Sequence, residues 1–313
     1  ARWYDIAVDF EGSANSSFYN GFGNPDTQQF GSNLSAQYAP GNANGYPDKA
    51  ETDGVIGKVT YSWKPSEGKM YYVTWSEGFR PGLLNRPVGR TSADGSYSVP
   101  PSVDSDEITN WEFGWKNVLR DGRLRFNGSI FRVDVSGLQS TIFDPSIVNL
   151  FFSDNAADAE IKGVEGDFIY YTDGGLILSG AFSMLDTEIT KSLIPTGDIV
   201  VGQELAFAPG YQANISGRKE WTMEGGNTGF WQLQFSMSDK SYSDIMQPNR
   251  AVQDSYNLTN LRAGISSDDW TAEMYVDNVT DERAEISNTF VFDRQRVAVI
   301  RPLTVGLRYK LKF

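Results

Sequence analysis

Alternation between apolar and polar side chains constrains this sequence more than any other feature. In its last stretch, apolar residues share one face of an extended chain and polar residues share the other. The apolar set is Leu303, Val305, Leu307, Tyr309, Leu311 and Phe313, and the polar set is Thr304, Gly306, Arg308, Lys310 and Lys312. Because successive side chains of a strand point to opposite faces, this stretch predicts a strand with one apolar and one wet side.

The same pattern recurs in about twelve segments along the chain. Clear examples cover residues 55–64, 111–116, 231–238 and 270–277, and the first segment, residues 4–11, also fits. One segment changes phase, because the apolar residues Leu124, Phe126 and Ile130 give way to Val133 and Val135. This change predicts a β-bulge near Phe131–Arg132.

Short and long connections alternate strictly between these segments. The short ones, residues 65–68, 120–122, 172–175, 223–227 and 266–269, are dominated by Gly, Asp, Asn and Ser, which favour tight turns. The long ones cover roughly residues 12–54, 80–105, 137–159, 187–208, 239–255 and 280–296. Outer-membrane β-barrels have this asymmetry, with tight periplasmic turns and long extracellular loops.

The wet faces and the placing of the aromatic residues favour a membrane barrel over a soluble β-domain. The wet faces are rich in charged and amide side chains, as a hydrated lumen requires, and the sequence has no apolar run of 18 residues that would predict a membrane-spanning helix. Trp and Tyr, which prefer the lipid headgroup level, lie beside the short turns, at Trp63, Tyr71, Tyr171, Trp221, Trp231 and Trp270. We therefore predict an all-β, antiparallel transmembrane β-barrel in the cell outer membrane, in contact with lipopolysaccharide and phospholipid.

The composition excludes several other functions. The 313 residues contain no Cys, which removes disulfides and thiol chemistry, and no His, which removes the commonest general base and metal ligand. The formal charge of −13 opposes nucleic-acid binding. We expect no enzymatic activity, no cofactor and no metal site.

Five motifs in order along the chain resemble those of TonB-dependent outer-membrane receptors. Residues 72–81 (YVTWSEGFRP) are similar to the family's S-x-G-F-R-x-P strand end, and residues 109–117 (TNWEFGWKN) to its E-x-G-x-K strand. Residues 155–167 (NAADAEIKGVEGD) are similar to N-x-A-x-x-x-x-G-x-E, and residues 275–284 (YVDNVTDERA) to V-x-N-L-F-D-x-x-Y. Residues 301–313 (RPLTVGLRYKLKF) are similar to the family's final strand, although Arg301–Pro302 stands where the family has Pro-Arg, and Asp281-Glu282 occupies the Phe-Asp region of the fourth motif.

The resemblance covers nearly the whole chain but only part of the family's architecture. It implies a barrel of 22 strands with a plugged lumen, of which about twelve strands are visible here. We expect residues 1–313 to form the C-terminal part of the barrel, with the plug domain, the N-terminal strands and the TonB box outside this chain. The family's function is the import of a scarce nutrient, coupled through the N-terminal part to TonB–ExbB–ExbD. A ferric siderophore is the expected ligand, while cobalamin, haem and oligosaccharides remain open.

Ligand would then bind between the outer loops and the plug. Arg forks suit carboxylate, catecholate or phosphate groups, and aromatic faces suit sugars or planar chelates. The loop candidates are Arg80, Arg86, Arg90, Tyr97, Phe143, Phe151, Phe152, Tyr242 and Arg250. For each one, loop packing or lipopolysaccharide contact is the alternative role.

Polar residues on the wet faces are candidates for holding the plug, or for merely lining a hydrated lumen. They are Glu112, Lys116, Arg125, Arg218, Gln234, Arg262, Glu273 and Arg308. The terminal Phe313 resembles the signal that the barrel-assembly machinery recognises in outer-membrane proteins.

Other functions stay open at this point. A stand-alone twelve-stranded barrel, such as an autotransporter translocator, would have a similar length and a terminal Phe, but no helical pattern precedes the first strand. A passive porin would share the wet and apolar faces without a plug. An outer-membrane enzyme would resemble barrel phospholipases, proteases and acyltransferases, which rely on a His that this chain lacks.

Overall fold

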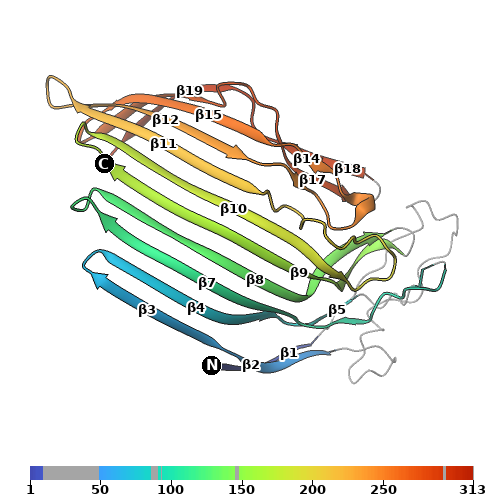
Figure 1. The fold of residues 1–313 in the computed structure, drawn as a ribbon. Coiled ribbons are helices and arrows are strands. Elements are labelled where there is room, and N and C mark those ends of the chain that lie inside the picture. The colour runs from blue at the N-terminus through green and yellow to red at the C-terminus, as the bar shows by residue number, and fades with distance from the viewer. Residues whose placement is uncertain (10–48, 86–90, 93, 145–147, 292–293, 313) are drawn as a thin grey trace.

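Long antiparallel strands lie side by side in one tilted, curved sheet (Figure 1). The computed structural model describes residues 1–9, 49–85, 91–92, 94–144, 148–291 and 294–312. The eleven strands of the main sheet, in order, are β3 (Lys58–Ser66), β4 (Lys69–Arg80), β7 (Asp106–Leu119), β8 (Leu124–Asp144), β9 (Val148–Tyr171), β10 (Leu176–Ser192), β11 (Tyr211–Thr222), β12 (Thr228–Ser238), β15 (Tyr256–Ser266), β16 (Trp270–Asp277) and β19 (Thr304–Leu311). Within these ranges no helix is long and apolar enough to cross a membrane.

The N-terminal strands continue the wall beyond the main sheet. Strand β1 (Arg2–Asp9) pairs along its whole length with β2 (Lys49–Ile56), which leads into β3 across Gly57. The sequence pattern placed residues 12–54 in a long connection and began one strand at Val55, which is wrong for residues 49–54, because β2 already pairs with β1 there. The break at Gly57 is held by β4, because Glu77 accepts a hydrogen bond from the Gly57 amide at 2.8 Å and donates its own amide to the Gly57 carbonyl at 2.9 Å. In the described residues β3 and β19 do not pair with each other, so the barrel is partial.

The short turns are confirmed, and the long connections are more regular than the sequence indicated. The turn residues 120–122, 172–175 and 223–227 join adjacent long strands. Three long connections contain small hairpins of their own, β5–β6 (Leu83–Leu84, Ser102–Val103), β13–β14 (Ser241–Tyr242, Val252–Gln253) and β17–β18 (Glu285–Val291, Arg294–Val299). The fifth connection also holds the 3-10 turn Gln247–Asn249.

The prediction of a connection over residues 137–159 is wrong. Strands β8 and β9 stay paired through this range up to Asp144↔Val148, with register irregularities between Val135 and Leu138. Gly137 lies at this irregularity with φ of 64°, a left-handed conformation that glycine adopts without strain. The two strands therefore project as a long hairpin beyond their neighbours.

Cross-strand register defines the two faces of the sheet. Directly paired residues share a face, so Trp111, Phe113 and Trp115 mark what we call the outer face, and Glu112 and Lys116 mark the inner face. On the outer face Trp63, Trp231 and Leu307 are 56%, 42% and 83% exposed, so these side chains form no packed core. The inner face carries hydrogen bonds between neighbouring strands, such as Ser179–Ser216 at 2.9 Å and Asn214–Ser236 at 2.6 Å.

The bulge predicted near Phe131–Arg132 is also wrong. The β7–β8 register runs without a shift from Glu107↔Ser136 to Leu119↔Leu124. The environment of the strand changes instead of its geometry. Ile130 is exposed on the outer face, whereas the next outward residues, Arg132 and Asp134, form an ion pair at 2.9 Å. Beyond Ile130, toward the long connections, β8 therefore carries charged side chains on the outer face.

Neighbouring strands change character at the same level. On β9, Lys162 and Glu160 follow Val164 on the outer face, and Glu160 also accepts from Arg132 at 2.6 Å. On β10, Asp186 follows Met184 and pairs across to Lys162. This line of charges marks the upper edge of the apolar band, as the end of a hydrocarbon layer requires.

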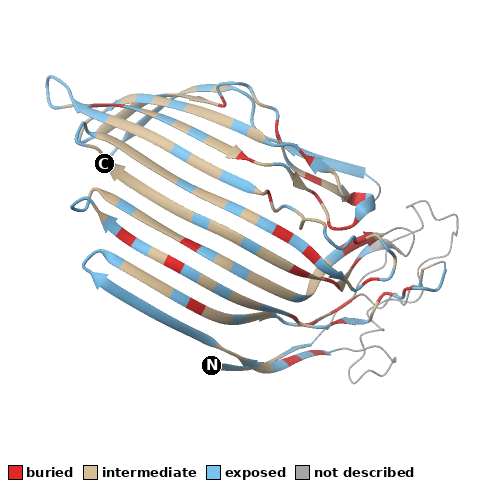
Figure 2. Cartoon of the chain, viewed as in Figure 1, coloured by how far each residue is buried: buried red, intermediate tan, exposed pale blue. Residues whose placement is uncertain are grey.

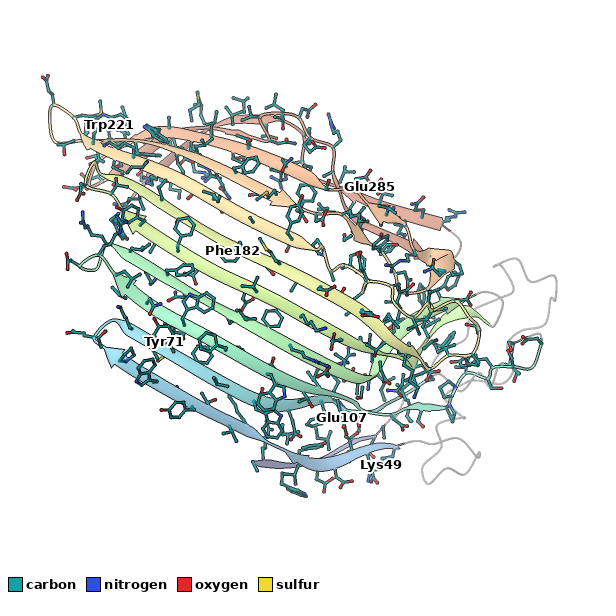
Figure 3. The ribbon with its side chains drawn as sticks, in the orientation of Figure 1. Lys49, Tyr71, Glu107, Phe182, Trp221 and Glu285 are labelled. Carbon is teal, nitrogen blue, oxygen red and sulfur yellow. The ribbon has the colours of Figure 1, made fainter. Side chains whose placement is uncertain are left out.

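Aromatic rings cover glycines on the adjacent strands. Figure 3 shows Phe182, whose ring lies over Gly166, while Phe168 covers Gly180 in return. Further directly paired examples are Tyr72–Gly114, Trp115–Gly128, Phe131–Gly163, Trp221–Gly229, Phe230–Gly264 and Tyr275–Gly306. Each ring shields a backbone that has no side chain of its own, which fixes the register of the pair.

Candidate functional site

The hydrophobic core of the described residues lies where the ends of β8, β9 and β10 meet the long connections, and not between layers of sheet. Figure 2 shows buried residues gathered where β8, β9 and β10 reach the long-connection end. The core residues are Tyr97, Val99, Ile142, Phe152, Ala156, Ala157, Ala159, Ile189, Ile194, Ile199, Ile245 and Met246. They come from four segments, residues 94–103, the described part of 138–159 (138–144 and 148–159), 189–206 and 243–250, and we call these four segments the loop cap.

The loop cap sits on the inner face of the strands. Ala159 pairs with both Val135 and Ile189, and the register places all three residues on the inner face. Ala159 and Ile189 belong to the core, and Val135 packs against it. The segments around Tyr97 and Met246 therefore fold inward over the ends of β8, β9 and β10.

Hydrogen bonds tie the four segments together. The Tyr97 hydroxyl donates to the Asp154 carboxylate at 2.5 Å. The side-chain amide of Asn249 donates to the Phe143 carbonyl at 2.9 Å, and Gln203 Nε2 donates to the Ile245 carbonyl at 2.5 Å. The β8–β9 hairpin is thus bonded to two other cap segments, through Asp154 to Tyr97 and through Phe143 to Asn249.

Burial shifts the ionisation of several cap groups. It raises the pKa of the Asp154 and Asp244 carboxyls above the usual range for aspartate, against the hydrogen bonds that each accepts. It also raises the pKa of the Tyr97 phenol and lowers that of the Arg250 guanidinium. These groups lie in the cap, above the line of charges that ends the apolar band.

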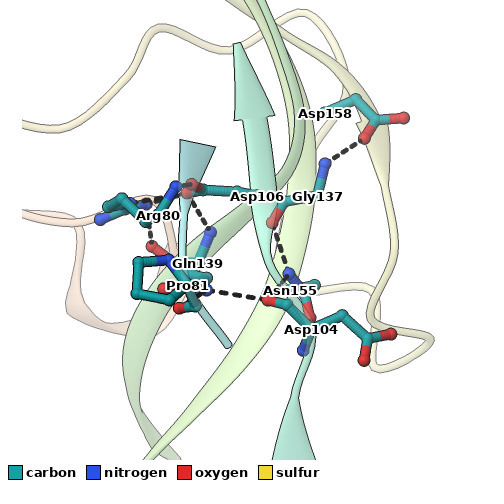
Figure 4. Close-up of polar contacts among 8 residues, drawn as sticks. All are labelled: Arg80, Pro81, Asp104, Asp106, Gly137, Gln139, Asn155 and Asp158. Carbon is teal, nitrogen blue, oxygen red and sulfur yellow. Dashed lines mark hydrogen bonds and ion pairs between the residues drawn. The ribbon is translucent and has the colours of Figure 1, made fainter. Parts of the chain in front are cut away.

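A polar network at the base of the cap joins the ends of β4, β7, β8 and β9 (Figure 4), and we call it the clasp. Buried Asp106 accepts from Arg80 Nε at 2.7 Å, from the Arg80 amide at 3.1 Å and from the Gln139 amide at 3.2 Å. Gln139 Nε2 donates to the carbonyls of Pro81 and Asp104 at 3.0 and 2.8 Å. Arg80 in turn donates to the Gln139 carbonyl at 3.0 Å.

Asn155 completes the clasp around the irregularity at Gly137. Its Nδ2 donates to the carbonyls of Asp104 and Gly137 at 3.0 and 2.6 Å, and its Oδ1 accepts from the Asp104 amide at 2.8 Å. The Gly137 amide donates to Asp158 at 2.8 Å. Arg80, Pro81, Asn155 and Asp158 belong to the sequence motifs quoted above, whereas Asp104, Asp106 and Gln139 were not singled out by the sequence. The physical role of the first and third motifs is therefore to meet at this clasp.

The fourth motif also closes a local network. Asn278, with φ of 55°, donates to the carbonyls of Glu282 and Arg301 at 2.9 and 2.8 Å. Asp281 accepts from the Leu303 amide at 2.8 Å. These bonds join the end of β16 to the start of β19, so the departure from the family pattern at Asp281 is accommodated by a bond to the chain just before the last strand.

The described loop candidates are mostly engaged within the protein. Arg80 belongs to the clasp, and Tyr97, Phe143 and Phe152 are buried. Phe151 packs on Phe143 with 5.0 Å between ring centroids and stays 38% exposed. Their role in ligand binding stays a prediction. Arg86 and Arg90 lie outside the described residues.

Tyr242 and Arg250 are brought together on the β13–β14 connection. The Arg250 guanidinium lies 3.8 Å from the centre of the Tyr242 ring and donates to the carbonyls of Asp244 and Glu204 at 2.7 and 3.0 Å. Lys240 Nζ lies 5.6 Å from the same ring centre. This aromatic ring with two cations keeps part of its surface exposed.

All eight wet-face candidates lie on the inner face. Glu112 accepts from the Tyr72 hydroxyl at 2.5 Å, Arg308 pairs with Glu273 at 3.0 Å, and Arg262 lies 3.8 Å from Asp277. Arg218 pairs with Glu220 and stacks 4.1 Å above the Phe230 ring. Lys116, Arg125 and Gln234 complete the set. Their contact with a plug stays a prediction, and Phe313 lies outside the described residues.

Among the described residues no group of Asp and Glu side chains is arranged to hold a metal ion. An antiparallel wall with an apolar outer band, a polar inner face and long connections at one end defines the class of transmembrane β-barrels.

The family follows from a direct match. Residues 21–279 match the family model described as "TonB dependent receptor-like, beta-barrel", which covers most of the chain. The chain belongs to the TonB-dependent receptors, a family of outer-membrane receptors and not of enzymes.

Solved structures share the fold at low sequence identity. The ferric yersiniabactin uptake receptor of Yersinia pestis gives a TM-score of 0.68 at 17% identity, over 85% of this chain and 38% of that one. The ferric preacinetobactin receptor of Acinetobacter baumannii gives 0.60 at 19% identity, over 85% and 37%. The ferric-catecholate import receptor of E. coli K12 gives 0.61 at 13% identity, over 98% and 40%. The chain thus spans about two fifths of the length of these receptors.

Proposed function

We propose that this chain forms part of the barrel wall of a receptor that imports a ferric siderophore with energy coupled through TonB. The observation that carries the proposal is the family match over residues 21–279, joined to a sheet with an apolar outer band and a polar inner face. The three structures compared above are described as receptors for ferric ligands, which favours iron as the cargo.

The remainder of the receptor is proposed to supply the other parts. Because the matched receptors are more than twice as long, residues 1–313 would be the C-terminal part of the barrel, with the plug domain and the N-terminal strands encoded elsewhere in the protein. The free edges of β3 and β19 support this proposal, because backbone groups inside lipid must all be paired. TonB–ExbB–ExbD would act through the plug.

The two faces of the sheet would have separate partners. The outer band would contact phospholipid and lipopolysaccharide, and the inner face would dock the plug. Lys116, Arg125 and Gln234 suit docking, because within the described part of the chain their side chains are left without a hydrogen bond or ion pair. Phe313 would serve the barrel-assembly machinery.

Ligand contacts are proposed for the candidates that keep exposed surface in the loops. Tyr242 and Arg250 offer an aromatic face with a guanidinium above it, and Phe151 offers a second aromatic side chain. A guanidinium and aromatic rings suit the carboxylate, catecholate or planar groups of an iron chelate. A sugar remains the alternative ligand.

The test is growth of a deletion strain. The gene is removed and growth is measured under iron limitation with single siderophores, and on single sugars with iron present. We expect a growth defect under iron limitation that the full-length gene restores, and that is equally severe in a strain without TonB. Normal growth under iron limitation with a defect on one sugar would replace the siderophore by that sugar. Rescue that persists without TonB would contradict energy coupling.

A further inference from the structure

The loop cap covers the inner face at the extracellular end of β8, β9 and β10. Its core includes Ala159 and Ile189, which are inner-face residues, and the segments around Tyr97 and Met246 lie over them. We propose that the loop cap is a fixed wall of the receptor's entrance, folded before ligand arrives and unchanged during transport. Ligand then enters beside this cap, over the other strands. The statement about ligand rests on the proposed function, whereas the fixed cap does not.

The side chains that would be uncovered make opening of the cap unfavourable. Ile142, Ile189 and Met246 are fully buried, and they come from three different cap segments. Moving any one segment would expose apolar surface on the others, and the removal of such surface from water is the main driving force of folding. A loop that runs over the surface without burying apolar side chains lacks this restraint on its movement.

The clasp anchors the same unit at its base. Asp106 binds the end of β4 and the amide of Gln139, so the β8–β9 hairpin cannot tilt away from β4 and β7 without breaking bonds to a buried carboxylate. Asn85 extends the anchor to Ser153 on β9, a residue that pairs with Thr141 of β8. The Asn85 side chain donates to the Ser153 carbonyl at 2.6 Å and accepts from the Ser153 amide at 2.8 Å.

The last long connection differs from the cap. None of its described residues belongs to the core, and Ile286, Val297 and Val299 on β17 and β18 are 50%, 43% and 53% exposed. This connection stands over β16 and β19, at the opposite side of the sheet from β4 and β7. If the receptor closes over ligand, this side has the freedom to move.

Hydrogen–deuterium exchange on the ligand-free, full-length receptor tests the fixed cap. Residues 223–227, an exposed turn, supply the fast reference, and β11 supplies the slow one. We expect amides in residues 148–159, 194–206 and 243–250 to exchange at least about 100-fold more slowly than the turn, and close to β11, since exchange follows the free energy of local opening. Exchange of these segments at the rate of the turn would overturn the proposal.

A matched pair of isoleucine variants tests whether the cap is one unit. Ile142→Ala removes a fully buried core side chain, and Ile130→Ala removes a side chain on the outer face that is 55% exposed. We expect Ile142→Ala to speed exchange in all four cap segments together and Ile130→Ala to leave them unchanged. Faster exchange confined to residues 138–144 would show that the cap is not a single unit and would overturn the proposal.

A reversible lock tests the claim that the cap stays closed during transport. The 313 residues contain no Cys, so Asn85→Cys with Ser153→Cys introduces a single pair of thiols at two positions that hydrogen bonds bring together, for closure as a disulfide that is verified by gel migration. We expect the oxidised and the reduced double variant to support equal growth under iron limitation. Loss of growth on oxidation with recovery on reduction would overturn the claim. If the deletion strain shows no iron phenotype, the proposed function fails, and the exchange experiment still decides on the cap.

Discussion

Glycine at position 166 shows how single residues fix this sheet. A Cβ on Gly166 would lie 2.9 Å from Phe182 Cε1 and 3.0 Å from the Asn127 carbonyl oxygen. Both distances are shorter than ordinary van der Waals contacts, so the ring or the strands would have to shift. Gly217, also on the outer face, has more room, because its nearest neighbour would be Leu178 Cδ2 at 3.5 Å.

These two glycines provide a matched test. We expect Gly166→Ala to lower stability by about 1–3 kcal/mol through overpacking. Gly217→Ala should be neutral or slightly stabilising, because alanine restricts the unfolded chain more than glycine does. The midpoint of heat-induced mobility shift on a gel measures both. Equal midpoints for the two variants would contradict the role of the ring-over-glycine pairs.

Asp154 gives the cap a dependence on pH. Burial holds the pKa of its carboxyl above the usual range, so between the usual and the raised value the folded cap binds a proton that the unfolded chain has lost. The stability of the cap therefore falls as pH rises through this window, and it increases on acidification. Asp244 contributes with the same sign.

Asp154→Asn removes the cost of the buried charge and keeps an oxygen that can accept from Tyr97. We expect cap amides of this variant to exchange more slowly at neutral pH than those of the native receptor, with a weaker dependence on pH. The measurement is exchange in residues 148–159 across the acidic range. If exchange in Asp154→Asn depends on pH as strongly as in the native receptor, titratable groups other than Asp154 cause the pH dependence.

Strand β8 shows at the element scale what alternation predicts and where it stops. The period of two gave the strands and their faces, because lipid and water impose opposite demands on neighbouring side chains. Beyond Ile130 the demands reverse, since Arg132 and Asp134 face the headgroup region while Val133 and Val135 lie on the inner face, where Val135 packs against the cap. A sequence pattern cannot separate this change of environment from a bulge, and it therefore predicts that the strand ends before residue 137, whereas β8 continues to Asp144.

The clasp is the element-scale feature that the sequence indicated only in part. Arg80 and Asn155 were visible in motifs, but their partners are 26 and 51 residues away in the chain, as Arg80–Asp106 and Asn155–Asp104 show. Such pairs follow from register and from the hairpin projection, which no local pattern specifies. For the same reason the sequence marks Arg80 as a ligand candidate but does not indicate that Asp106 binds its guanidinium.

Two aspartates paired with arginine test the clasp. Asp106→Asn weakens four hydrogen bonds at a buried carboxylate, and we expect a loss of about 1–3 kcal/mol with earlier protease cleavage in residues 81–105. Asp134→Asn breaks an exposed pair with Arg132 and should cost about 0–1 kcal/mol. Similar cleavage rates for the two variants would remove the clasp from the account.

At the scale of the whole molecule, apolar side chains gather in two places, the exposed outer face of the sheet and the buried core of the loop cap. The outer face leaves large side chains such as Leu307 without a packed partner in the described chain, and only the loop cap has a core. A water-soluble β-domain would bury the side chains of the outer face in a packed core, as the loop cap buries its own. The membrane therefore completes the structure of the wall, and the cap is the part that folds on its own contacts.

Accessibility along β12 tests this division most directly. Single cysteines from Trp231 to Met237 in the Cys-free sequence carry a spin label, and collision rates with oxygen and with a water-soluble nickel complex are measured in bilayers. Labels at 231, 233, 235 and 237 should favour oxygen, and labels at 232, 234 and 236 should not, with a period of two. Collision rates without a period of two would contradict a lipid-facing outer band. Equal access of the nickel complex to all positions from 231 to 237 would contradict it as well.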